Sequence, residues 1–133
     1  MTSIHKELVL GASPETVWDV VRDVGAVATR FAPGFVVDVQ MQDGARVVTF
    51  ANGMVARELI VDLDEAARRL AYAVRSERLL HHNASFQVLE GEAGGCRLVW
   101  HADVLPDAAG PNLDAMMTQG LEAAKRALDR VPA

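Results

Sequence analysis

Arg57 is the side chain that the sequence most clearly places where it can do chemistry. In residues 54–63 it alternates in step with Val55 and Leu59, so a strand there sets a guanidinium on an apolar face. Arginine keeps its charge at neutral pH, and a buried charge must be paired or hydrogen-bonded. We therefore predict that Arg57 points inward and binds a carboxylate, carbonyl or enolate oxygen of a ligand. A register shift or bulge would instead leave it in solvent or paired with a carboxylate on a neighbouring strand.

His82 is the second candidate, because alternation sets it on the same face as Phe86 in the predicted strand 80–90. Neutral imidazole both donates and accepts hydrogen bonds. An inward His82 near Arg57 can therefore act as an acid or base on a ketone or hydroxyl group. The alternative is a hydrogen-bonded histidine in the core or at its rim.

Tyr72 and Trp100 each carry a polar tip on an aromatic body, which suits a residue that lines a cavity and offers a hydrogen bond. Ordinary core packing explains the same pattern. Methionines adapt to an apolar ligand, and a glycine within a helix leaves space for close packing or for a ligand. The predicted ligand-binding residues are Arg57, Tyr72, His82, Phe86, Trp100, Met116, Met117, Gly120 and Leu121. Arg57, Tyr72 and His82 are also the candidates for catalysis.

The sequence predicts neither a metal site nor a cofactor. His81 and His82 are adjacent in a predicted strand and so point to opposite faces, while the other histidines have no recognised ligand spacing. Cys96 is the only cysteine, which excludes an internal disulfide and a cysteine-based zinc site. Its place in a strand pattern favours a buried apolar role over a reactive thiol. Nucleophile-elbow, phosphate-loop and dinucleotide-binding patterns are absent from the sequence.

A long amphipathic helix, predicted for residues 112–131, is the element that must cover these side chains. Its apolar residues recur at helical spacing and form one stripe. The stripe consists of Leu113, Met116, Met117, Gly120, Leu121, Ala124 and Leu128. A helix of about 19 residues is roughly 28 Å long, which is enough to cross a small sheet.

Almost everything before this helix alternates as β-strands do. The predicted strands are residues 3–10, 35–42, 46–51, 54–63, 70–75, 80–90 and 96–105, with tight turns at Asp43-Gly44 and Asn52-Gly53. Ser13-Pro14-Glu15 is typical of a helix start, and a second short helix is predicted for residues 26–31. The order predicts an α+β fold, in which a curved antiparallel sheet of seven strands wraps around the C-terminal helix.

The bulk properties narrow the class of protein further. The 133 residues are half hydrophobic, which predicts one domain, residues 1–133, with its own core. Thirteen basic and 18 acidic residues give a net charge of −5 without blocks, which argues against a nucleic-acid surface. No leader pattern and no run near the ~20 apolar residues of a membrane span occur, so we expect a cytoplasmic protein. The sequence leaves a homodimer open.

Several short segments together resemble one known superfamily. They are residues 12–23 (ASPETVWDVVRD), 31–34 (FAPG), 70–72 (LAY) and 98–100 (LVW), with Arg57, Glu58, Leu59 and Asp62. The chain resembles the START-like polyketide cyclase/dehydrase superfamily, often called SRPBCC. The resemblance implies a seven-stranded helix-grip fold with a deep cavity between the sheet and the C-terminal helix. Known members bind lipids, sterols, quinones, plant hormones or polyketide chains, and some are aromatase/cyclases in which an inward arginine holds the ligand.

Three functions follow from these observations. The first is a carrier or sensor that encloses a small hydrophobic molecule, such as a lipid, polyketide, aromatic or isoprenoid, with one polar end. The second is a cyclase/aromatase or dehydratase-like enzyme, in which Arg57 stabilises an enolate and His82 or Tyr72 moves protons. The third is a protein-interaction module whose cavity is filled by its own side chains.

Overall fold

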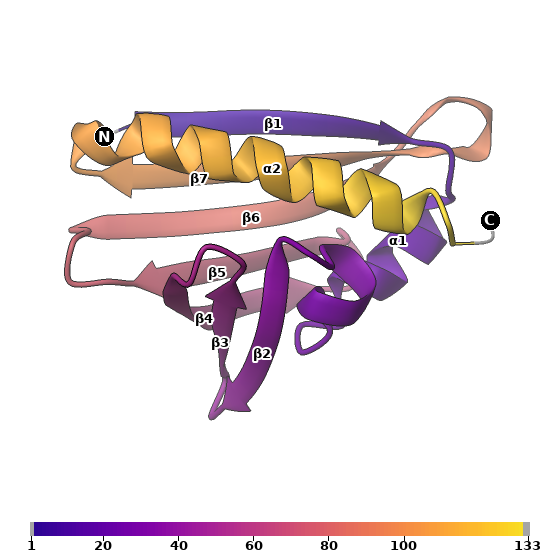
Figure 1. Ribbon diagram of the computed structural model, residues 1–133. Coiled ribbons are helices and arrows are strands. Elements are labelled where there is room, and N and C mark those ends of the chain that lie inside the picture. Colours follow the sequence, from indigo (N-terminus) through magenta and orange to yellow (C-terminus); the bar gives the residue numbers. More distant parts are fainter. Residues whose placement is uncertain (1, 132–133) are drawn as a thin grey trace.

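A seven-stranded antiparallel sheet wraps around one long helix in the computed structural model, which describes residues 2–131 (Figure 1). The strands are β1 (Thr2–Leu10), β2 (Val36–Gln42), β3 (Ala45–Phe50), β4 (Val55–Asp64), β5 (Arg69–Arg75), β6 (His81–Glu90) and β7 (Cys96–Leu105). The helices are α1 (Pro14–Val21) and α2 (Gly110–Leu128), with helical turns at Val27–Phe31, Glu92–Gly94 and Asp107–Ala109. The predicted α+β fold is confirmed, and every predicted strand matches an observed one to within about one residue at each end.

The strands lie in the order β1-β7-β6-β5-β4-β3-β2, so the first strand pairs with the last one. Figure 1 shows α2 running along β1 and β7, while β2 to β5 curve away from it. An ion pair of 2.7 Å between Lys6 of β1 and Asp114 of α2 joins the helix to this part of the sheet. Helix α2 therefore packs most closely against the half of the sheet that contains β1.

The helix termini follow from local chemistry. Ser13 precedes α1, and its side-chain oxygen accepts a hydrogen bond of 3.2 Å from the backbone N–H of Thr16, as predicted for a helix cap. The predicted second helix is the π-helical turn Val27–Phe31. The long helix α2 begins two residues before its predicted start and ends three before its predicted end, and most of its apolar stripe is buried.

Cys96 is fully buried, as predicted, and burial raises the pKa of its thiol. It belongs to a core that α1, the sheet and the C-terminal half of α2 enclose together. The largest almost fully buried side chains of this core are Leu70, Leu98, Met117, Leu128, Val17 and Val88. Within residues 2–131 no helix is long and apolar enough to cross a bilayer.

The two predicted hairpin turns differ in loop length. Gln42 pairs with Ala45 across the two-residue loop Asp43-Gly44, as expected for that sequence. The next loop contains three residues, because the backbone N–H of Phe50 bonds the carbonyl oxygen of Met54 at 2.8 Å. A change of one residue in register exchanges the two faces of a strand. The inner face of β4 therefore carries Glu58, whereas a two-residue loop would have placed Arg57 there.

A second irregularity lies later in β4, where the register against β5 shifts between Ile60 and Asp62. Such a β-bulge places the extra residue outside the regular alternation. Val61 stays on the outer face with Arg57 and is exposed, whereas Leu63, which lies opposite Leu70, returns to the core. The single face that alternation predicted for residues 55–63 is therefore broken once, between Val61 and Leu63.

Candidate functional site

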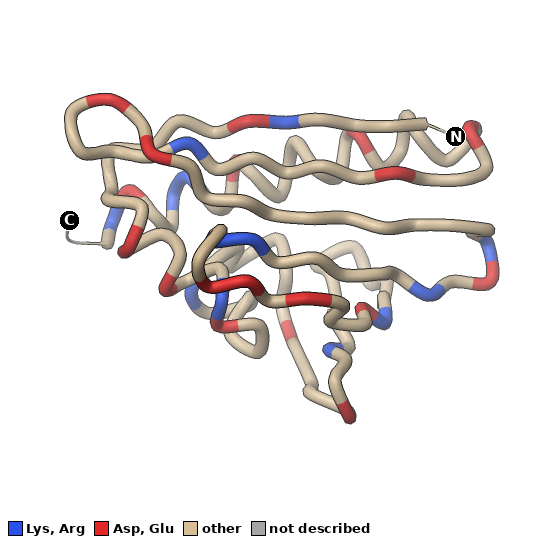
Figure 2. Tube along the Cα trace, turned by 180° about the vertical axis from the view of Figure 1, so that it is seen from behind, with Lys and Arg blue, Asp and Glu red and all other residues tan. Residues whose placement is uncertain are grey.

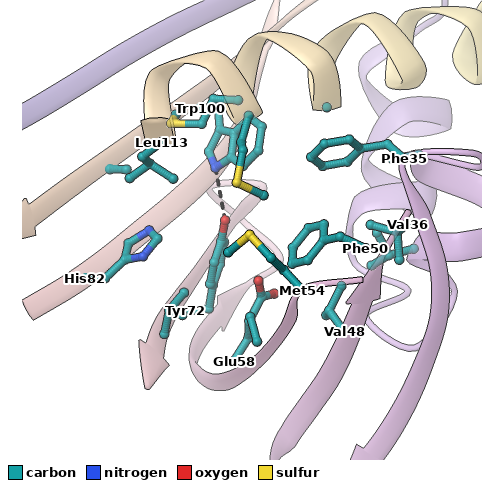
Figure 3. A pocket seen from close by; sticks show the side chains of 18 of the residues that line it. Phe35, Val36, Val48, Phe50, Met54, Glu58, Tyr72, His82, Trp100 and Leu113 are labelled. Atoms are coloured by element: carbon teal, nitrogen blue, oxygen red, sulfur yellow. Dashed lines mark hydrogen bonds between the residues drawn. The ribbon is translucent and has the colours of Figure 1, made fainter. Parts of the chain in front are cut away.

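A cavity of about 290 Å³ lies between the inner face of the sheet and α2 (Figure 3). Apolar and aromatic side chains make up most of its wall, with α1 and the turn Val27–Phe31 at its inner end. Its lining also includes residues that are exposed to solvent, and these mark the mouth. The exposed lining residues are Met54, Val55, Ser76, Arg78 and Asn112. The cavity is thus a pocket that opens between the β3–β4 loop, the β5–β6 connection and the start of α2.

The wall contains a buried ion pair between Arg46 of β3 and Glu58 of β4. These residues lie directly opposite each other, and Arg46 Nε donates to Glu58 Oε1 at 2.7 Å. Only 4% of Arg46 and 8% of Glu58 is exposed. Arg46 also donates from Nη1 to the backbone carbonyl oxygen of Val24 at 3.2 Å, and its Cζ lies 5.2 Å from the centre of the Tyr72 ring. The guanidinium is therefore held on three sides.

Glu58 has hydrogen-bonding capacity left over. Within residues 2–131 the carboxylate accepts one hydrogen bond, at Oε1, and its second oxygen has no partner. Burial raises the pKa of Glu58, and the charge of Arg46 opposes that rise. Figure 3 shows the Glu58 carboxyl group among the side chains of the pocket, close to Tyr72. A ligand that carries an N–H or O–H donor can bind there.

Tyr72 and Trp100 form a second polar feature inside the aromatic wall. Trp100 Nε1 donates to the Tyr72 hydroxyl oxygen at 3.0 Å. Phe86 stacks on Trp100 with 4.5 Å between ring centres, which fixes the orientation of the indole. Burial raises the pKa of the Tyr72 hydroxyl, so it remains a neutral phenol at physiological pH. Because the phenol oxygen already accepts from Trp100, its O–H is free to donate to a ligand.

His82 lines the pocket below Leu113 of α2 and beside Tyr72 (Figure 3). Its Nδ1 atom is enclosed and has no hydrogen-bond partner in the described part of the chain. Burial, and then the charge of neighbouring His81, lower the pKa of His82, so its imidazole is neutral at pH 7. A buried nitrogen without a partner costs stability unless a ligand or water satisfies it.

This environment predicts how stability depends on pH. The folded-state pKa of His82 is depressed, so protonation favours the unfolded chain. Its neutral form is fully stabilising above the ordinary value of 6.5, and that contribution is lost as the pH falls towards the folded-state pKa. Chemical denaturation at pH 8 and pH 5 should therefore show a smaller pH dependence for His82→Gln than for the wild type. Equal pH dependence of both proteins would contradict a buried, neutral His82.

Helix α2 closes the pocket with Met116, Met117 and Gly120. A side chain at Gly120 would lie 3.1 Å from the Trp100 ring and 3.2 Å from the Phe35 ring, so glycine lets both aromatic rings pack under the helix. Leu121 was predicted to contact a ligand, but it is buried in the core and does not line the pocket.

Arg57 requires a correction. Its side chain is exposed, it does not line the pocket, and it lies across from Val47 and Arg75 on the outer face of the sheet. The prediction that it points inward is wrong, because the three-residue β3–β4 loop turns its strand position outward. The open alternative of a solvated Arg57 agrees with this placement.

The Arg46–Glu58 pair was missed in the sequence. One signal existed: the two residues have opposite charges and lie six positions on either side of Asn52 in a predicted hairpin. Opposite charges at facing positions stabilise a strand pair. Arg46 and Glu58 can be assigned to facing positions only once the length of the β3–β4 loop is known. Among residues 2–131 no group of three or more His, Cys, Asp or Glu side chains is arranged to hold a metal ion.

Comparisons with known proteins support the fold and name a family. The model of a family described as polyketide cyclase/dehydrase and lipid transport matches residues 1–133. No curated protein sequence matches. The structure is similar to XoxI from Bacillus cereus (TM-score 0.86, 17% identity, 96% of each chain covered).

Two further solved structures are similar. One is a START superfamily protein from Mycobacterium smegmatis (TM-score 0.73, 16% identity, covering 96% of this chain and 94% of that one). The other is the di-domain ARO/CYC BexL (TM-score 0.83, 14% identity), where the match covers 97% of this chain and 47% of that one. At these identities the likeness shows the fold alone.

Proposed function

Because this chain belongs to the polyketide cyclase/dehydrase and lipid transport family, we propose that it binds a small hydrophobic ligand between the sheet and α2. The observation that carries the proposal is an apolar pocket of about 290 Å³ with a charged pair recessed in its wall. Apolar pockets with a few placed polar groups are the usual sites for small molecules. Burial of apolar ligand surface contributes about 25 cal/mol per Å².

The polar groups define the part of the ligand that they contact. Glu58 offers a carboxylate oxygen that accepts, and Tyr72 offers a hydroxyl that donates. Arg46 is already engaged by Glu58 and Val24, which disfavours a free carboxylate on the ligand. The best match is a lipid, polyketide or aromatic molecule with an apolar body and a hydroxyl, phenol or amine at one end.

Native mass spectrometry of the purified protein, followed by denaturing extraction, tests this proposal directly. We expect an apolar species at one copy per chain, or an empty protein that binds N-phenyl-1-naphthylamine with a rise in fluorescence. Competition by 1-naphthol, which has a hydroxyl donor, is then compared with competition by 1-methylnaphthalene, which has none. The difference in affinity gives the contribution of the donor, apart from that of the apolar body. A folded protein that co-purifies with no ligand and binds none of these probes would refute the proposal.

Glu58→Gln tests the polar end. A hydrogen bond to a charged group is worth about 1.5–3 kcal/mol, so the affinity for 1-naphthol should fall at least about tenfold. The affinity for 1-methylnaphthalene should change little, because that molecule has no donor. Equal losses for the two probes would show that the substitution disturbs the pocket as a whole.

A cyclase-type enzyme is the second candidate, and the environment of Glu58 favours it. A buried carboxyl group with a raised pKa is suited to proton transfer, and the Tyr72 hydroxyl can stabilise an enolate oxygen beside it. In such a reaction Glu58 would take a proton from carbon next to a ligand carbonyl, and the electron pair would move onto the oxygen. Cyclised product from a β-polyketone, lost in Glu58→Gln while binding persists, would establish the enzyme. Binding without product would establish the carrier.

A further inference from the structure

The rim of the pocket mouth has three exposed apolar side chains. Leu80, at the end of the β5–β6 connection, is 85% exposed, while Val55 and Met54 are 62% and 48% exposed. Leu79, next to Leu80, lines the pocket, so Leu80 stands immediately outside the mouth. Single exposed apolar residues are common on protein surfaces, but these three surround one opening.

The same rim is basic. Arg57, Arg75 and Arg78 lie beside the mouth: Arg57 pairs across the sheet with Arg75, and Arg78 lines the opening. Within residues 2–131 none of the three guanidinium groups makes an ion pair or a hydrogen bond, although the backbone N–H of Arg78 donates to Ser76 Oγ. Figure 2 shows basic segments gathered at the end of the sheet where β5 leads into β6. Glu77 is the acidic residue of that connection.

This arrangement of arginines lowers the stability of the protein when no partner is bound. Like charges that face each other on neighbouring strands destabilise a sheet, and Arg57 faces Arg75 without a carboxylate between them. Most other basic side chains of this acidic chain are paired, including Lys6, Arg22, Arg30 and Arg97. Within residues 2–131 Arg69, Arg126 and Arg130 also lack an ion pair, but Arg57, Arg75 and Arg78 lie together at the mouth, where an anionic partner would neutralise their charge.

We propose that the mouth rim docks on the surface of an anionic phospholipid bilayer. Leu80 enters the boundary between headgroups and acyl chains, and the guanidinium groups of Arg57, Arg75 and Arg78 bind lipid phosphates. Docking in this orientation sets the pocket mouth against the apolar layer. A hydrophobic ligand can then pass between membrane and pocket without crossing water, a consequence that rests on the proposed function.

A bilayer fits this rim better than an acidic protein does. The exposed apolar residues come from two short segments, Met54 and Val55 where the β3–β4 loop enters β4 and Leu80 in the β5–β6 connection, and they are few. Stable protein interfaces bury about 800 Å² on each partner and need complementary shapes. A bilayer accommodates single protruding side chains and supplies phosphates at every position around them.

Vesicle flotation tests the proposal without any knowledge of the ligand. Vesicles of phosphatidylglycerol and phosphatidylcholine should bind the protein, and phosphatidylcholine alone should bind at least about tenfold less, because the attraction is largely electrostatic. Binding should weaken as salt is raised. Leu80→Asp and the double variant Arg57→Glu/Arg75→Glu should each reduce binding about tenfold or more.

Matched controls lie at the other end of the molecule. Val9→Asp alters a side chain that is 70% exposed near the end of β1, and Arg126→Glu reverses an exposed arginine near the end of α2. Both should bind vesicles as the wild type does. N-phenyl-1-naphthylamine binding in solution reports whether each variant keeps its pocket, which separates failure of docking from failure of the proposed function.

Two results would overturn the proposal. One is no binding to anionic vesicles at low salt by a protein that is folded by circular dichroism. The other is binding that needs the arginines but not Leu80 and is matched by retention on heparin beads. That second pattern would assign the rim to a soluble polyanion or an acidic protein.

Discussion

Replacing Arg46 by methionine should lower the free energy of unfolding by about 3–5 kcal/mol at pH 7, because it leaves the Glu58 carboxylate buried without its partner. The pair lies at facing positions of β3 and β4, and its two side chains are almost fully enclosed. The lost bond to the carbonyl oxygen of Val24 adds to the effect. Urea denaturation followed by circular dichroism measures the change.

The double variant Arg46→Met/Glu58→Leu is the matched control. It removes both charges and fills the same space with apolar atoms, so most of the lost stability should return. If the double variant is as unstable as the single one, packing around Arg46 matters more than its charge does. The difference between the two variants isolates the cost of the unpaired carboxylate.

The stability of Arg46→Met should also depend on pH in a defined direction. Burial raises the folded-state pKa of Glu58. The contribution of this group to stability is therefore fully present below its ordinary pKa of 4.5 and is lost as the pH rises through the folded-state pKa. Removal of Arg46 takes away the charge that opposes this shift. The deficit relative to the double variant should therefore shrink between pH 7 and pH 4.5. A deficit under about 1 kcal/mol at every pH would mean that solvent reaches the pair.

Filling the pocket should abolish ligand binding while the fold persists. Ala56 lies on the inner face of β4 and lines the pocket, so Ala56→Phe should place a phenyl ring where the ligand binds. We expect the affinity for N-phenyl-1-naphthylamine to fall about a hundredfold or more, since probe and ring compete for one volume. Overpacking costs about 1–3 kcal/mol where no space exists, and the cavity here reduces that cost.

Ala73→Phe is the control for this substitution. Ala73 lies between Leu59 and Asn83 on the outer face of the sheet, where a phenyl ring points away from the pocket. Its probe affinity should match that of the wild type. Unchanged probe binding by a folded Ala56→Phe protein would place the binding site outside this pocket and remove the basis of the proposed function.

Local sequence patterns were sufficient to predict which segments form helices and strands. Alternation at period two and the apolar stripe of residues 113–128 are local patterns, and Ser13 and Asp43-Gly44 act within a few residues of themselves. The sequence also predicted correctly which residues of β5, β6 and β7 lie on the inner face of the sheet. Tyr72, His82, Phe86 and Trp100 lie on the pocket because those strands keep an unbroken alternation.

Which charged residues of β3 and β4 lie inside depends on how the two strands pair, and local patterns do not contain that information. The face of a strand depends on its pairing with a neighbour, and one residue in the β3–β4 loop exchanged Arg57 for Glu58. The bulge after Ile60 then returned Leu63 to the inner face, opposite Leu70. Apolar alternation within β4 predicted the opposite face. The ion pair between Arg46 and Glu58 forms across two strands, so the pattern of either strand alone does not indicate it.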